Sequence, residues 1–130
     1  MRYKTHKWVR PEDLNANGTL FGGKLLSWID DEAALYSIVI LKNNKIVTKF
    51  MSEINFMSSA RQGDIIEIGL DIIRFGSTSI TMKCEVRNVM TKATIITVDA
   101  ITMVNLDSFG QPAVHGKSKE VLSIDEKVSE

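Results

Sequence analysis

The sequence predicts an α+β fold in which a five-stranded antiparallel sheet wraps around one long helix. Apolar residues recur at helical spacing over residues 23–41. After that stretch the apolar period changes to two over four further segments. A long helix has to bury its apolar stripe on another element, and a twisted antiparallel sheet is the surface that this chain offers.

The composition is that of an ordinary globular protein, and we expect one domain over residues 1–130. Sixteen basic and sixteen acidic residues cancel, so we expect neither nucleic acid nor a membrane as partner. The N-terminal MRYKTHKW lacks the apolar core of a signal peptide. A single cysteine, Cys84, suits a reducing compartment, so we expect a cytoplasmic protein. From Gly110 onward the chain turns polar, and we expect residues 110–130 to be partly mobile.

The helix is expected over residues 23–41, a stretch without proline. Its apolar residues are Leu25, Leu26, Ile29, Ala33, Tyr36 and Ile40. At about 1.5 Å per residue the helix is roughly 27 Å long, enough to cross a small domain. Lys42 and the two asparagines after it are expected to end it, because asparagine tolerates a left-handed turn.

Along the sequence, one strand is expected before the helix and four after it. A first strand runs from Arg2 to Val9, before Pro11 breaks it. Apolar and polar residues alternate over 46–56, 66–73 and 79–86, and a last strand runs from Thr94 to Leu106. In SITMKCEV, Cys84 faces inward as a small core residue. The links RQGD, RFGST and NVMTKA are short, so we expect consecutive strands to be antiparallel neighbours.

Residues 15–30, NANGTLFGGKLLSWID, place two glycines before the helix and a carboxylate inside it. One helical face carries small residues around a single acid: Gly23, Ser27, Asp30, Ala34 and Ser37. The first turn of a helix presents unpaired N–H groups, and glycines let a ligand approach them closely. Backbone donors beside an acid are the parts needed to hydrolyse an ester or thioester. A tight entry turn and a solvated aspartate would give the same spacing.

The pattern N-A-N-G-x-L-F-G-G-x-L-L-x-x-x-D resembles the signature of hotdog-fold acyl-CoA thioesterases. It is most similar to the YciA-like bacterial branch, which resembles the cytosolic acyl-CoA hydrolases of animals. FMSSARQGD, RFGSTSI and NLDSFGQP resemble further segments of the family, so the resemblance covers most of the chain. Ser59 departs from it, because the family usually has proline near this position. The resemblance implies the hotdog fold and hydrolysis of acyl-CoA to free CoA and a carboxylic acid.

The resemblance also implies a role for each residue of the helix entry. Asp30 is the catalytic carboxylate, as general base or as nucleophile, and Asn15 holds the water or the carbonyl. The amides of Gly22 and Gly23 polarise the thioester carbonyl. The family forms homodimers with sites shared between two chains, and trimers of such dimers. Apart from CoA as part of substrate and product, we expect no cofactor, and no spacing of cysteines or histidines predicts a metal site.

A second set of residues is expected to contact the CoA portion of the substrate. It consists of Arg61, Arg74, Ser77, Thr78 and Ser79, all at predicted turns. Each of these residues taken alone is typical of a solvent-exposed hairpin end. As a group they would line the rim where the diphosphate and pantetheine emerge, because arginine and hydroxyl groups suit phosphate oxygens.

Two other functions stay open. A non-catalytic acyl-CoA-binding regulator would keep the groove without needing Asp30. Enoyl-CoA hydratases and dehydratases that resemble this fold use a histidine, but His6 and His115 lie far from the glycine-led helix in the sequence.

Overall fold

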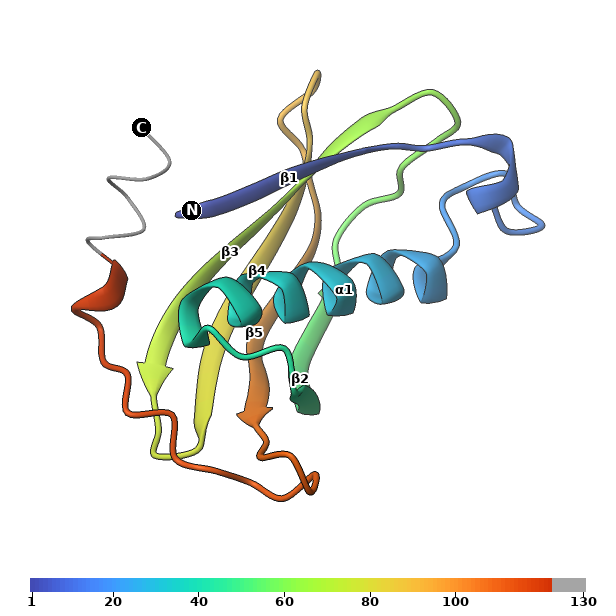
Figure 1. Cartoon of the computed structure of the whole chain (residues 1–130). Helices are drawn as coiled ribbons and strands as arrows, with labels where there is room; N and C mark the ends of the chain where they lie inside the picture. The colour runs from blue at the N-terminus through green and yellow to red at the C-terminus, as the bar shows by residue number, and fades with distance from the viewer. Residues whose placement is uncertain (123–130) are drawn as a thin grey trace.

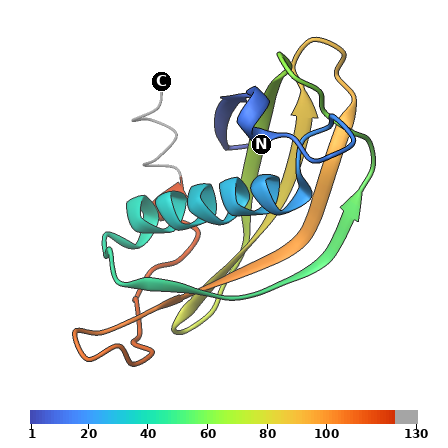
Figure 2. The ribbon, with the colours of Figure 1, turned by 90° about the vertical axis from the view of Figure 1, so that its right-hand side faces the viewer.

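The computed structural model describes residues 1–122 of the chain. One helix, α1 (Gly22–Leu41), lies across one face of a five-stranded antiparallel sheet (Figures 1 and 2). The strands are β1 (Tyr3–Trp8), β2 (Ile46–Phe56), β3 (Ile65–Phe75), β4 (Ser79–Asn88) and β5 (Thr94–Asn105), and a 3-10 turn, η1 (Pro11–Asp13), follows β1. The predicted α+β architecture is confirmed.

Helix α1 buries one apolar stripe against the sheet. The buried apolar positions are Leu25, Ile29, Ala33, Tyr36, Ile40 and Leu41, which recur at the spacing of one helical face. The helix ends at Lys42, whose φ of 55° is left-handed and whose amide donates to the Ile38 carbonyl at 2.8 Å. The residue in the left-handed conformation is thus Lys42 and not one of the two asparagines after it. Asn43 instead donates from its side chain to Asn105 Oδ1 at 2.7 Å, which ties the end of α1 to the end of β5.

The strand order in the sheet is β1-β3-β4-β5-β2. The prediction that consecutive strands are neighbours holds for β3, β4 and β5 and is wrong for β2 and β3, because β2 pairs with β5. Residues 57–64 carry the chain past two strands. Three strand spacings amount to about 14 Å, and eight extended residues reach about 26 Å, so the link is long enough. β5 is buried along most of its length, as suits a strand between two others.

The core lies between α1 and the concave face of the sheet. Most of its largest fully buried side chains come from the helix and from β3, β4 and β5, and these include Ile29, Tyr36, Ile68, Met82 and Ile101. Cys84 is only 2% exposed, which confirms it as a small core residue, and burial raises the pKa of its thiol to about 12.

Strand β2 is irregular, and the strict alternation predicted for it is wrong. A β-bulge lies between Thr48 and Phe50, and Glu53 has a left-handed φ of 54°. An extra residue in one strand shifts the facing of the side chains after it. Met51 therefore packs against the core, whereas Phe50 is 46% exposed.

The described part of the polar C-terminal segment folds back on the sheet. The Ala113 amide donates to the Asn105 carbonyl at 2.9 Å, and a ring nitrogen of His115 lies 2.9 Å from the Ser79 carbonyl. Leu122 packs against the core. The rest of the segment expected to be mobile, residues 123–130, lies outside the described residues. Within residues 1–122, no helix combines the length and the apolar character needed to cross a membrane.

Candidate active site

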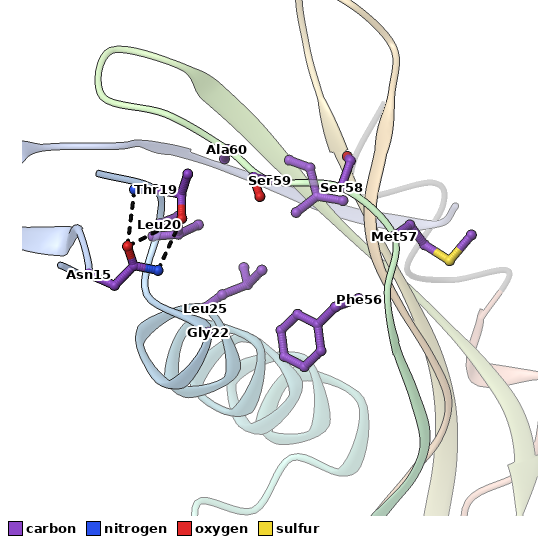
Figure 3. Close-up of a pocket in the computed structure, with 11 residues that line it drawn as sticks. Asn15, Thr19, Leu20, Gly22, Leu25, Phe56, Met57, Ser58, Ser59 and Ala60 are labelled. Carbon is purple, nitrogen blue, oxygen red and sulfur yellow. Dashed lines mark hydrogen bonds between the residues drawn. The ribbon is translucent and has the colours of Figure 1, made fainter. Parts of the chain in front are cut away.

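The start of α1 borders a pocket with a volume of about 350 Å³ (Figure 3). The pocket lies between the loop before the helix, the first turns of α1 and the segment that follows β2. It is lined by Asn15, Thr19, Leu20, Gly22, Leu25, Phe56, Met57, Ser58, Ser59, Ala60 and Ile95. The structure therefore brings together two of the residues that the sequence singled out, Asn15 and Gly22.

The first turn of α1 presents backbone donors to this pocket. No side chain of the described residues caps the helix, and the residue before it, Phe21, is extended. The first N–H groups of a helix have no partner within it, and the positive end of the helix dipole lies there. Gly22 lines the pocket, whereas Gly23 is exposed and outside its lining. Within one chain, only the first of the two glycines borders the pocket.

Asn15 is held in place by its own loop. Its Oδ1 accepts hydrogen bonds from the amides of Asn17 at 2.9 Å and Thr19 at 3.2 Å. Its Nδ2 donates to Thr19 Oγ1 at 3.0 Å (Figure 3). Two amide donors on the oxygen fix which end of the side chain is the nitrogen. The described residues give the second Nδ2 hydrogen no partner, so the side chain both shapes the loop and keeps one donor for a ligand.

Asp30 lies outside the pocket, on the side of α1 that faces β2. Eight residues separate it from Gly22, about 12 Å along the helix axis. Thr48 of β2 donates from Oγ1 to Asp30 Oδ1 at 2.5 Å. None of the pocket-lining residues in the described chain is a carboxylate. Within one chain, the helix-entry donors and the acid are therefore separate.

The small-residue face of α1 is open only in part. Gly23 and Ser27 are exposed and Asp30 is half-buried, but Ser37 is fully buried and its hydroxyl donates to the Ala33 carbonyl at 2.7 Å. The space along the helix therefore ends near its last turns.

Sequence reasoning missed Thr48. The sequence does contain a sign of its position. Thr48 is two residues after Ile46 on a predicted strand, so the two side chains are on the same face, and Ile46 packs against the core.

The five residues expected to form one CoA-binding rim lie in two places. Arg61 forms a β-bridge with Thr19 beside the helix entry. Arg74, Ser77, Thr78 and Ser79 lie at the β3–β4 hairpin. Arg61 precedes β3 and Arg74 lies near its end, so about 30 Å of extended strand separates the two places. Within one chain the five residues therefore do not form a single cluster, and their contact with CoA stays a prediction.

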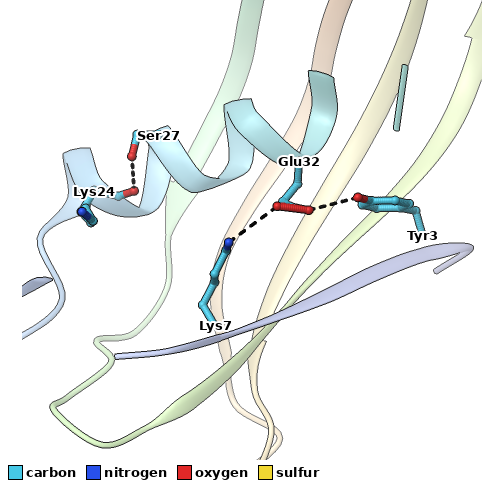
Figure 4. Close-up of polar contacts among 5 residues, drawn as sticks. All are labelled: Tyr3, Lys7, Lys24, Ser27 and Glu32. Carbon is cyan, nitrogen blue, oxygen red and sulfur yellow. Dashed lines mark hydrogen bonds and ion pairs between the residues drawn. The ribbon is translucent and has the colours of Figure 1, made fainter. Parts of the chain in front are cut away.

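A second polar cluster, not predicted, joins α1 to β1 (Figure 4). Glu32 is 6% exposed, accepts a hydrogen bond from the Tyr3 hydroxyl at 3.0 Å, and lies 3.7 Å from Lys7 Nζ. Burial, together with this carboxylate, raises the pKa of Tyr3 to about 12. The Tyr3 ring also stacks on Tyr36, with 4.6 Å between ring centroids. These contacts fix the position of the helix on the sheet.

The two histidines lie away from the pocket. His6 Nε2 is 3.2 Å from a Glu67 carboxylate oxygen on neighbouring β3, and His115 contacts the Ser79 carbonyl. Within residues 1–122, no three histidine, cysteine, aspartate or glutamate side chains lie close enough together to hold a metal ion. The expectation of no metal and no cofactor stays a prediction.

Known proteins resemble this chain in sequence and in fold. The model of the thioesterase superfamily matches residues 17–93. An uncharacterized acyl-CoA thioester hydrolase of Buchnera aphidicola subsp. Baizongia pistaciae is 36% identical over 108 residues, which are 78% of this chain and 79% of that protein.

The acyl-CoA thioester hydrolase YciA of Salmonella typhimurium is 33% identical over 76 residues, 58% of this chain. The chain spans 56% of the length of that relative. Among solved structures, the hexameric thioesterase y2039 from Yersinia pestis is 28% identical, with a TM-score of 0.78 over 85% of this chain and 91% of that one.

Proposed function

This chain belongs to the thioesterase superfamily, with a hotdog fold, and we propose that it hydrolyses acyl-CoA to free CoA and a carboxylic acid. The observation that carries the proposal is the pocket at the start of α1. There the Gly22 backbone and the Asn15 side chain border one cavity. The names of the relatives from Buchnera and Salmonella support the same reaction.

The helix entry supplies the electrostatic part of the catalysis. When water adds to the thioester, the carbonyl oxygen becomes negatively charged. Donors at the amides of Gly22 and Gly23 stabilise this charge more strongly than they stabilise the neutral carbonyl, because the helix dipole adds to each hydrogen bond. Asn15 Nδ2 provides a further donor to the carbonyl or to the water. Removing one donor of this kind costs about a hundredfold to a thousandfold in turnover.

Asp30 supplies the base or the nucleophile, from a neighbouring chain. In the described residues the pocket contains no carboxylate, and Asp30 lies about 12 Å along the helix from Gly22. β2, which holds Asp30 through Thr48, is an edge strand of the sheet. An unpaired edge is a natural place for a second copy to add its own strand. One site then combines Asn15 and Gly22 of one protomer with Asp30 of the partner subunit.

Three such dimers form a hexamer in our proposal. The Yersinia structure, which resembles this chain at 28% identity, is described as a hexameric thioesterase. The second cluster of the predicted CoA-binding residues, around Arg74, lies far from the pocket of its own chain and would act on a neighbouring site.

The reaction needs only water and the thioester, so the proposal includes no metal or redox cofactor. A cytoplasmic location is supported by the thiol of Cys84, which is buried and unpaired in the described chain.

Release of free thiol from acyl-CoA tests the proposal directly. The purified protein is incubated with acyl-CoA substrates from acetyl to palmitoyl, and the thiol is followed with a colorimetric reagent. Turnover that depends on Asp30 supports hydrolysis. Acyl-CoA binding without thiol release would instead identify a non-catalytic binding protein.

A further inference from the structure

The pocket at the start of α1 has an apolar floor. Four of its lining residues are apolar and at most 9% exposed: Leu20, Leu25, Ala60 and Ile95. In acyl-CoA the acyl chain is the apolar portion, and the CoA portion carries the phosphates. Burial on this floor therefore favours the acyl chain.

The size of the pocket restricts the chain that fits. Its volume of about 350 Å³ lies near the lower end of the roughly 300–1,000 Å³ typical of small-molecule sites. The thioester group at Gly22 takes up part of this space. The remainder holds an acyl chain of limited length, and a long fatty acyl chain would have to extend beyond the floor.

Phe56 stands where such an extension would begin. It is the last residue of β2, and its ring points toward the start of α1, near Gly22 and Leu25 (Figure 3). A Cβ atom on Gly22 would lie 3.2 Å from Phe56 Cε1 and 3.3 Å from Cζ, so the ring occupies space that glycine leaves open. Phe56 is 58% exposed in the single chain, so its side chain lies between the buried floor and the surface of the protomer.

We infer that Phe56 limits the length of the acyl chain, so that short acyl-CoA thioesters are hydrolysed better than long ones. The inference rests on the proposed hydrolysis, because it concerns the same pocket. Removing the ring opens the pocket beside Gly22, at the end of β2. A longer chain can then lie in the pocket while its thioester stays at the helix entry.

The test compares kcat/KM for butyryl-CoA and decanoyl-CoA, measured by thiol release. The variants are Phe56→Ala, the milder Phe56→Leu, and Phe50→Ala as a matched control. Phe50 lies on the same strand, is 46% exposed and does not line the pocket. We expect the decanoyl-to-butyryl ratio to rise about tenfold or more in Phe56→Ala, because one misfitting methylene is worth roughly 10–200-fold in an apolar pocket. It should rise less in Phe56→Leu and stay unchanged in Phe50→Ala.

Two results overturn the inference while the proposed function stands. One is a wild-type protein that already prefers decanoyl-CoA. The other is an unchanged ratio in both Phe56 variants, with melting temperatures that show them to be folded. If the wild type releases no thiol from either substrate, the proposed function fails, and this inference fails with it.

Discussion

Thr48 of β2 holds Asp30 of α1 through a hydrogen bond of 2.5 Å from its Oγ1 to Oδ1 of the carboxylate. The bond places the acid on the side of the helix that faces the edge strand, away from the pocket of its own chain. It occupies one carboxylate oxygen and leaves Oδ2 to act on a water or on the thioester. The proposed two-chain site depends on this orientation.

Replacing Asp30 with Asn should reduce kcat by about a hundredfold or more, the effect of losing a general base. Asparagine keeps the shape and can still accept the bond from Thr48. Binding of a non-hydrolysable acyl-CoA analogue, measured by calorimetry, should change little. A variant that keeps most of its activity would assign Asp30 a structural role.

Thr48→Val should reduce kcat about tenfold with little change in KM, because valine keeps the volume and removes only the donor that orients Asp30. The free energy of unfolding should fall by about 1 kcal/mol, the net value of one hydrogen bond. Thr97→Val on β5 is the control, since no side-chain hydrogen bond involves Thr97 in the described structure. Equal kinetics in the two variants would show that the Thr48 bond does not position the acid.

Gly23→Val should damage activity more than stability. A Cβ at this position would come within 2.9 Å of Phe21 Cε2, but the Phe21 ring is 55% exposed and can move. The added side chain then crowds the first turn of α1, whose amides form the proposed oxyanion site. We expect kcat/KM to fall at least about tenfold, with the melting temperature within a few degrees of wild type. Normal hydrolysis by this variant would show that the thioester oxygen does not lie beside residue 23.

The Tyr3–Glu32 contact predicts a loss of stability at high pH. The folded pKa of Tyr3 is raised from 10.0 to about 12, so the folded state keeps a proton that the unfolded state releases. The contribution of Tyr3 to the free energy of unfolding is complete below pH 10 and is lost as the pH rises toward 12. Cys84, raised from 9.0 to about 12, acts in the same direction from a lower pH.

Urea unfolding at several pH values from 9 to 12 tests this dependence. Tyr3→Phe should be less stable than wild type at pH 9, because Glu32 loses a hydrogen-bond donor, but its stability should decline less steeply above pH 10. Measuring both proteins in a Cys84→Ala background removes the thiol contribution. Parallel declines for the two proteins would contradict the assignment to Tyr3.

Much of this structure was predictable from local patterns. The apolar stripe of α1 and the alternation in β4 each repeat over many residues, and the resemblance at the helix entry indicated the family that the comparisons confirm. The place of β2 was not predictable, because β5 comes between β2 and β4 only through long-range pairing. The bulge after Thr48 depends on pairing between distant segments. The burial of Glu32 does so too, and nothing in the acidic run of residues 30–32 distinguishes the one buried acid from its neighbours.

The central claim, that each site draws on two chains, is tested most directly by mixing two inactive variants. Asn15→Asp keeps the oxygen that accepts from the amides of Asn17 and Thr19, and replaces the Nδ2 donor. Asp30→Asn removes the acid from the other half of the site. After subunit exchange, verified by native mass spectrometry, a heterodimer should contain one intact site and recover about half of the wild-type turnover. Heterodimers without activity would show that each chain carries its own complete site, and would contradict the account.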